Sequence, residues 1–131
     1  MTTYVLATNT PSVSETLCDH IRDEVGEGDT VHAVNSQEGG TNTGADEIRQ
    51  GKEALRVVEE ALGDVATVET RQIVEGNTPA EDVLATVEAV ESDQLVIGIR
   101  RRSRTSRLLF GSVATDILLA SEVPMRVVPR E

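Results

Sequence analysis

Arginines gather in one short stretch of a sequence that is otherwise acidic. The segment GIRRRSRTSRLLFGS, residues 98–112, carries five arginines, whereas the whole chain of 131 residues has a formal net charge of -11. Guanidinium groups bind phosphate oxygens through paired hydrogen bonds, and several of them can balance the charge of a triphosphate. The cluster therefore predicts an anion site. Its members are Arg100, Arg101, Arg102, Arg104 and Arg107.

The end of the same segment adds a second feature that favours an anion. The apolar run 94–99 predicts a buried strand, and the pattern of 112–121 predicts a helix. A helix start exposes free backbone N–H groups and the positive end of the helix dipole. Gly111 has no side chain to keep a phosphate from the backbone, and Ser112 offers a hydroxyl beside the N–H groups of the next two residues. This junction is therefore predicted to cradle phosphate.

Composition argues against other uses of the arginines. A strongly acidic protein repels nucleic acid and anionic membranes at long range, and aromatic residues, at 2% of the chain, leave little for a base to stack on. We therefore expect no nucleic-acid partner and no membrane partner. A surface loop whose arginines pair with the acidic surface remains an alternative. The carboxylates suit a high-salt cytoplasm, as in a halophilic or haloarchaeal cell, although an ordinary acidic protein has a similar balance.

The other reactive side chains indicate no catalytic machinery. Cys18 is the single cysteine and falls in a helical pattern, where a buried thiol is the expected state. His20 and His32 are expected to be packed or surface residues, and no Cys/His spacing indicates a metal site. Neither a Walker A motif nor G-x-S-x-G is present. We expect no enzyme, or at most a slow ATPase whose phosphates are held by arginine and Mg²⁺.

The elements that must position these residues alternate along the chain. Short apolar runs predict five strands, at 4–7, 30–35, 66–74, 94–99 and 125–128, and amphipathic stretches predict four helices, at 11–25, 46–62, 79–90 and 112–121. Strands this apolar face water on neither side, which predicts an α/β fold with one parallel sheet covered by helices on both faces. We expect a single domain over residues 1–131.

Local signals refine this plan. A capping box is expected at Ser12 and Glu15 in the first helix and at Thr78 and Glu81 in the third. In open parallel sheets ligands bind beyond the carboxyl ends of the strands, so the loops after the first, second and fourth strands should form the site. The N-terminus MTTYVLATNT has no basic leader, and no segment approaches 18 apolar residues, so a cytoplasmic protein is expected.

The segment from Gly98 to Ser112 resembles the signature of the universal stress protein family, in which G-x-x-G is followed by nine residues and then G-[ST]. Arg101 occupies the place of the second glycine, and Gly111 with Ser112 completes the motif. The stretch VEGNTPAEDVL is similar to the family's turn into its third helix, and SVATDILLASEVPMRVV to its last helix and strand. The resemblance covers nearly the whole chain.

This resemblance implies a Rossmann-like or flavodoxin-like sheet in the order 3-2-1-4-5, a homodimer through Met125 to Val128, and an adenine nucleotide site. Asn9 stands where the family usually has an aspartate that contacts the nucleoside, and Ala7 lies at the same strand end. The main chain around Ala33 or Val34 would meet the adenine. The positions implied to contact phosphate and ribose are Ile97, Gly98, Arg100, Arg101, Gly111, Ser112, Val113 and Ala114.

Two functions therefore remain open. The first is a regulatory module that binds an adenine nucleotide, ATP, through the loop between the fourth strand and the fourth helix. The second is a dimeric stress-response interaction protein of the same fold that binds no nucleotide. Gly98 and Gly111 favour the first function, whereas Asn9 and Arg101 favour the second. The Arg101 side chain either replaces the backbone contact of the missing glycine or fills the pocket.

Overall fold

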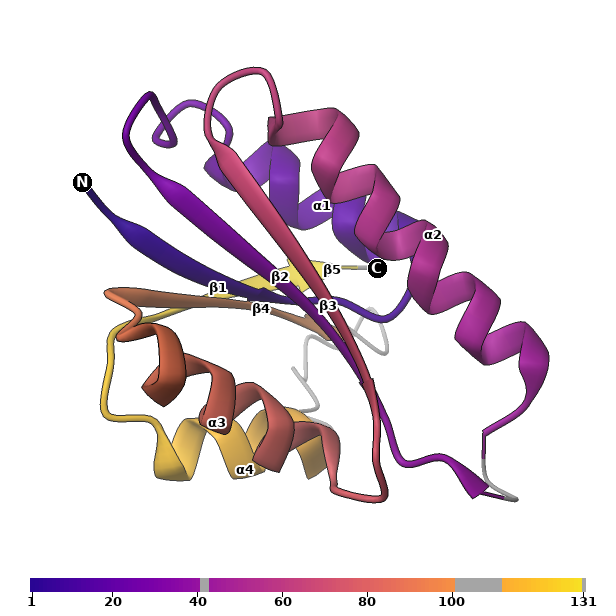
Figure 1. Cartoon of the computed structure of the whole chain (residues 1–131). Helices are drawn as coiled ribbons and strands as arrows, with labels where there is room; N and C mark the ends of the chain where they lie inside the picture. The colour runs from indigo at the N-terminus through magenta and orange to yellow at the C-terminus, as the bar shows by residue number, and fades with distance from the viewer. Residues whose placement is uncertain (41–42, 101–111, 131) are drawn as a thin grey trace, which may run out of the picture.

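The computed structural model describes residues 1–40, 43–100 and 112–130, so most of the arginine-rich segment lies outside the described residues. Strands and helices alternate along the chain, as the sequence predicts (Figure 1). None of the described helices is both long enough and apolar enough to cross a membrane. The strands are β1 (Thr3–Ala7), β2 (Thr30–Gln37), β3 (Thr67–Val74), β4 (Gln94–Arg100) and β5 (Met125–Arg130); the helices are α1 (Pro11–Ile21), α2 (Ala45–Leu62), α3 (Pro79–Val90) and α4 (Ser112–Ala120).

The strands form one parallel sheet in the order β3-β2-β1-β4-β5, which confirms the predicted fold class. Helices α1 and α2 cover one face of the sheet, and α3 and α4 cover the other (Figure 1). The chain runs from β1 outward to β2 and β3 and then returns to β4 on the other side of β1. Strand order therefore reverses between β1 and β4, where a ligand cleft is expected in such a sheet.

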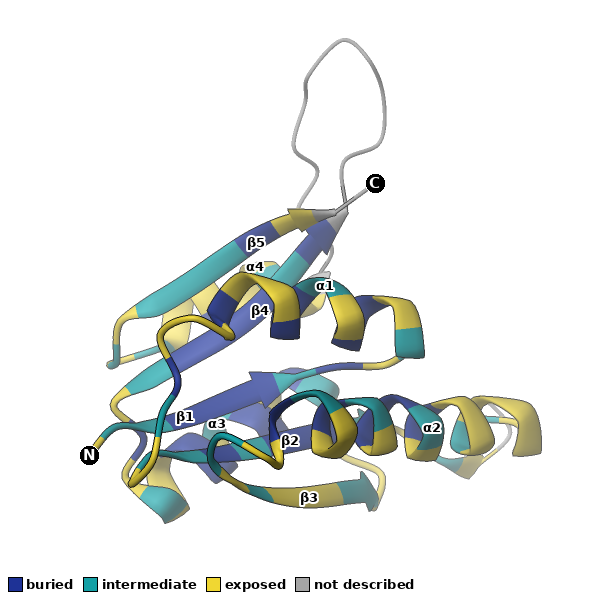
Figure 2. Cartoon of the chain, turned by 90° about the horizontal axis from the view of Figure 1, so that it is seen from above, coloured by how far each residue is buried: buried dark blue, intermediate teal, exposed yellow. Residues whose placement is uncertain are grey.

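Each face of the sheet has its own apolar core, and the middle of the sheet is the most buried part (Figure 2). Under α1 and α2, the helical stripe of Val13, Leu17 and Ile21 is buried as its spacing predicts. Cys18 lies in the same core, and burial raises the pKa of its thiol to about 12. The second core, under α3 and α4, contains Val5, Val34, Ala80, Val83, Val87, Leu95, Ile97 and Ile117.

Helix α1 begins differently from the prediction. Its N-cap is Thr10, whose Oγ1 accepts a hydrogen bond from the backbone N of Val13 at 3.3 Å. The predicted capping box of Ser12 and Glu15 is therefore wrong. Pro11 explains the difference, because its fixed φ and missing N–H suit the first position of a helix, which leaves Thr10 as the cap.

Helix α3 begins as predicted. Thr78 Oγ1 accepts a hydrogen bond from the backbone N of Glu81 at 3.2 Å, and Glu81 Oε1 accepts one from the backbone N of Thr78 at 2.9 Å. The hydrogen bond that the Thr78 backbone N donates to the carboxylate, with a smaller contribution from the Thr78 side chain, holds the pKa of the Glu81 carboxyl below its usual value. The helix start is thus fixed by local chemistry, and it places Pro79 and the residues after it beside the ends of the strands.

Strand β2 continues to Gln37, past its predicted end at Asn35. The longer strand pairs with β3 over its whole length, so that Asn35, Ser36 and Gln37 lie in the sheet and not in the loop predicted after it. Successive strand residues point to opposite faces. Asn35 lies against Gly51 of α2, whereas Ser36 bonds to α3 on the other face.

Candidate functional site

A cleft of about 330 Å³ opens at the carboxyl ends of β1, β2 and β4, where the strand order reverses. The first turns of α3 and α4 form two of its walls. Most of its lining is aliphatic, and we call it the apolar cleft. Seven residues predicted from the sequence to contact a nucleotide line this cleft: Ala7, Asn9, Val34, Ile97, Gly98, Val113 and Ala114.

The predicted main-chain contact at Ala33 or Val34 stays a prediction. The Ala33 side chain is fully buried on the opposite face, in the core under α1 and α2. At these positions β2 is paired with β1 on one side and β3 on the other, and the Val34 carbonyl accepts a hydrogen bond from the backbone N of Thr8 at 3.0 Å. The free end of the strand lies further along, at Gln37.

The remaining predicted residues belong to the junction between β4 and α4. Arg101 and Gly111 lie outside the described residues, while Arg100 is described as the last residue of β4 and Ser112 as the first of α4. Both elements border the apolar cleft, through Gly98 and its neighbours in β4 and through the first turn of α4. The arginine-rich segment therefore joins two walls of the cleft.

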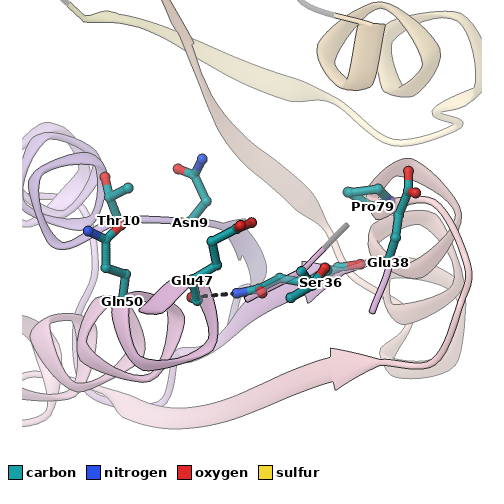
Figure 3. A pocket seen from close by; sticks show the side chains of 9 residues that line it. Asn9, Thr10, Ser36, Glu38, Glu47, Gln50 and Pro79 are labelled. Carbon is teal, nitrogen blue, oxygen red and sulfur yellow. Dashed lines mark hydrogen bonds between the residues drawn. The ribbon is translucent and has the colours of Figure 1, made fainter. Parts of the chain in front are cut away.

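A second cleft, of about 410 Å³, adjoins the apolar cleft beyond the end of β2 (Figure 3). The two clefts share Asn9, Ser36 and Pro79. Glu38 and Glu47 bring carboxylates to the second cleft, and its described lining contains no lysine or arginine. We call it the polar cleft. Its charge disfavours a phosphate and suits groups that donate hydrogen bonds.

Ser36 is held at the border of the two clefts by a buried carboxylate that sequence reasoning missed. Ser36 Oγ donates to Asp82 Oδ2 at 2.5 Å, and Asn77 Nδ2 donates to Asp82 Oδ1 at 3.2 Å. Asp82 is only 5% exposed. Aspartate side chains are ordinarily exposed. The available signal was its place next to Val83, on the side of α3 that faces the sheet.

Asn35, on the other face of the sheet, is the centre of a polar network, which we call the closed network because the Asn35 side chain is fully buried. Its Nδ2 donates to the Thr8 carbonyl at 3.0 Å, and its Oδ1 accepts hydrogen bonds from Gln37 Nε2 and Gln72 Nε2, each at 3.0 Å. In the outer part of this network, the buried Oε1 of Gln37 has no hydrogen-bond partner among the described residues. Gly51 of α2 lies so close that a Cβ there would overlap the Asn35 amide. The network ties the end of β1 to β2, β3 and α2, and thereby supports one wall of the site.

The clefts offer little chemistry for catalysis or for a metal. Among the described residues, no group of three or more His, Cys, Asp or Glu side chains could hold a metal ion. His32 lies along β2 with its Nδ1 3.7 Å from Glu69 Oε2 and does not line either cleft. The described lining of the clefts combines aliphatic side chains with hydroxyl, amide and carboxylate groups, which suits the binding of a ligand that has both apolar and polar parts.

The fold and the cleft define a class of protein, a doubly wound α/β domain with a ligand cleft between β1 and β4. The family model for "Universal stress protein family" matches residues 2–129. The chain belongs to the universal stress protein family.

Solved structures of the family have the same fold. A universal stress protein from Archaeoglobus fulgidus is 28% identical, with a TM-score of 0.74, and the match covers 100% of this chain and 99% of that one. The A. fulgidus universal stress protein in complex with dAMP is 24% identical, with a TM-score of 0.67 and coverage of 100% and 98%. An Arabidopsis thaliana family protein with AMP bound is 16% identical, with a TM-score of 0.62 and coverage of 100% and 93%.

A curated relative is similar over part of the sequence. The stress response protein NhaX of Bacillus subtilis is 31% identical over 70 residues, which are 53% of this chain and 38% of that protein. The matched segment thus spans well under half of the relative.

Proposed function

We propose that this chain is a regulatory module that binds an adenine nucleotide, with ATP as the ligand, in the apolar cleft. The observation that carries the proposal is the gathering of Ala7, Gly98 and the start of α4 around one cleft at the switch point. Relatives of the same fold were solved with dAMP and AMP bound. We take residues 1–131 as one universal stress protein domain.

The phosphates would lie between β4 and α4. Gly98 leaves room for close approach to the strand, and Val113 and Ala114 contribute the backbone N–H groups of the first turn of a helix that borders the cleft. The arginines of segment 100–107 would supply the positive charge that a triphosphate needs. Any Mg²⁺ would be carried by the phosphates, and slow ATP hydrolysis would be compatible with such a site.

The proposal is tested by isothermal titration with Mg-ATP and AMP in molar KCl. Ala114 lines the apolar cleft, so Ala114→Leu fills it and should weaken ATP binding by at least about tenfold. Ala120→Leu makes the same change at an exposed position of the same helix and should leave affinity unchanged. Binding that is equally strong in both variants, or absent in the wild type, would refute the proposal.

A second candidate function is a dimeric interaction protein that binds no nucleotide. Leu119 of α4 is 83% exposed and Leu118 is 39% exposed, and β5, with Met125 to Val128, is an edge of the sheet. An unprotected edge strand is a ready site for pairing with a second copy. Light scattering in molar KCl should give twice the chain mass of 14.1 kDa. The mass of a single chain would contradict the homodimer, whether or not the protein binds a nucleotide.

We also propose a cytoplasmic protein of a halophilic, haloarchaeal cell. The net charge of -11 makes the folded chain repel itself, and salt at about 1 M screens charges beyond about 3 Å. The urea concentration at the unfolding midpoint should therefore rise between 0.1 M and 2 M KCl. A midpoint independent of KCl would favour an ordinary acidic protein.

A further inference from the structure

The hydroxyl hydrogen of Ser36 is already donated to another side chain of the protein. Asp82 lies behind it, almost fully buried, and its carboxylate accepts the Ser36 hydrogen through Oδ2 at 2.5 Å. A serine hydroxyl has a single hydrogen to donate, and an ionised carboxylate can only accept. Toward the clefts, Ser36 is therefore a hydrogen-bond acceptor.

We propose that Asp82 is a positioning residue that fixes Ser36 as an acceptor, so that the apolar cleft prefers a purine with an amino group at the 6-position over a 6-oxo purine. This inference rests on the proposed function, since it assumes that a purine nucleotide occupies the cleft. The inference gives a role to the hydrogen bond between Ser36 and Asp82, which connects two walls of the cleft, one in β2 and the other in α3.

The arrangement of the clefts decides which part of the ligand would meet Ser36. The ends of β2 and β4 lie on opposite sides of β1, two strand spacings apart, or about 10 Å. With the phosphates beside Gly98 and α4, the base extends toward β2 and Ser36. The reverse orientation would direct phosphates at Glu38 and Glu47 of the polar cleft, where like charges repel them.

Asp82→Asn tests the inference because an amide, unlike a carboxylate, can donate a hydrogen bond to Ser36. With Asn77 Nδ2 still donating to the atom in the place of Oδ1, that atom is the amide oxygen and the amide nitrogen takes the place of Oδ2. The nitrogen then donates to Ser36 Oγ, which frees the serine hydrogen to point into the cleft. The variant keeps shape and both hydrogen bonds but turns Ser36 into a donor.

The measurement is the ratio of the dissociation constants of AMP and IMP, determined by titration in molar KCl. Wild-type protein should bind AMP about tenfold more tightly than IMP, the value of one hydrogen bond gained or lost. In Asp82→Asn the ratio should fall to about one or reverse, and in Ser36→Ala it should also fall to about one. A ratio changes with the chemistry of Ser36, whereas a general loss of structure weakens both ligands together.

Glu81→Gln is the matched control, because it removes the same charge one residue earlier in α3 from an exposed side chain. Gln also retains the capping hydrogen bond. Its ratio should equal that of the wild type. If AMP binds and Ser36→Ala keeps the wild-type ratio, the inference is wrong while the proposed function stands. If the wild type binds neither AMP nor IMP, nor ATP, both fail together.

Discussion

Asn35 and Ser36 are neighbours in β2 and carry similar polar groups, yet the fold surrounds them in opposite ways. The Asn35 side chain is fully buried under α2 and makes its hydrogen bonds to protein groups on every side. Ser36 is partly exposed, bonds to one carboxylate behind it and borders two clefts. The difference shows that two neighbouring polar residues of one strand can supply both a buried structural tie and a polar group that borders a cleft.

Packing explains the contrast. On the α2 face, Gly51 lets the helix approach β2 until no space remains around the Asn35 amide. On the other face, α3 and α4 start at the ends of the strands and leave an opening between their first turns. A closed polar group stabilises the fold only while every partner is present, whereas an open one can exchange a partner with water or ligand.

The largest loss of stability is expected for Asn35→Ala. The change removes the acceptor of Gln37 and Gln72 and the donor to the Thr8 carbonyl, and it leaves a cavity. The free energy of unfolding should fall by about 3 kcal/mol. Urea unfolding in molar KCl measures it. A loss below about 1 kcal/mol would mean that water enters this network and that it is not closed.

Gly51→Ala should have the next largest effect. A methyl group at this position would overlap Asn35 Oδ1 and lie 2.8 Å from Gln37 Nε2, so these side chains must leave their hydrogen bonds or α2 must move away from β2. Alanine improves helix propensity by about 1 kcal/mol, yet we expect a net loss of about 2 kcal/mol. Gly26→Ala is the control, since no atom lies within 4 Å of the added methyl group, and it should be nearly neutral. Equal stability of the two variants would contradict close packing at Gly51.

Ser36→Ala should change stability less than either variant of the closed network. Asp82 loses one hydrogen bond but keeps that from Asn77, and water can enter from the clefts beside it. We expect a loss of about 1 kcal/mol in urea unfolding. A loss as large as that of Asn35→Ala would show that Ser36 belongs to the packing of the sheet and not to an open site.

The smallest effect is expected for Arg126→Ala, at an ion pair far from both polar groups. Arg126 Nη1 donates to Glu24 Oε1 at 2.7 Å, and this bond holds the pKa of the Glu24 carboxyl below its usual value. A lowered pKa contributes stability at neutral pH, which is lost as the pH falls through the folded-state pKa.

Thermal unfolding of wild type and Arg126→Ala measures this contribution. The wild type should be slightly more stable at pH 7, and the difference should vanish at a pH where Glu24 is protonated in the folded protein. A difference that persists in acid would assign the effect to packing of the arginine side chain and not to the charge pair.

Local sequence patterns predict much of the fold. Alternating apolar runs and amphipathic stretches predict the five strands and four helices, and the spacing of Thr78 and Glu81 predicts the start of α3. The start of α1 was mispredicted because Thr10 and Ser12 are both good cap residues. The choice between them depends on Pro11, which favours the earlier cap.

The positions that the resemblance supplied gather at one place, whereas the length of β2 was mispredicted. Asn9, Gly98, Val113 and Ala114 come together at one cleft. The Ala33 side chain lies in the core on the opposite face of the sheet, because successive strand residues alternate between faces. The polar end of β2 reads as loop in the sequence, yet pairing with β3 satisfies its backbone and extends the strand.

By itself, the sequence determined the order of the elements, the family and the concentration of positive charge between β4 and α4, because each depends on residues close together in the chain. Tertiary structure alone decided that Ser36 meets Asp82 across 46 positions and that Asn35 is closed in by Gly51. Successive side chains of a strand point to opposite faces of the sheet. How closely a helix packs on each face then determines whether a polar side chain there is fully buried or remains accessible.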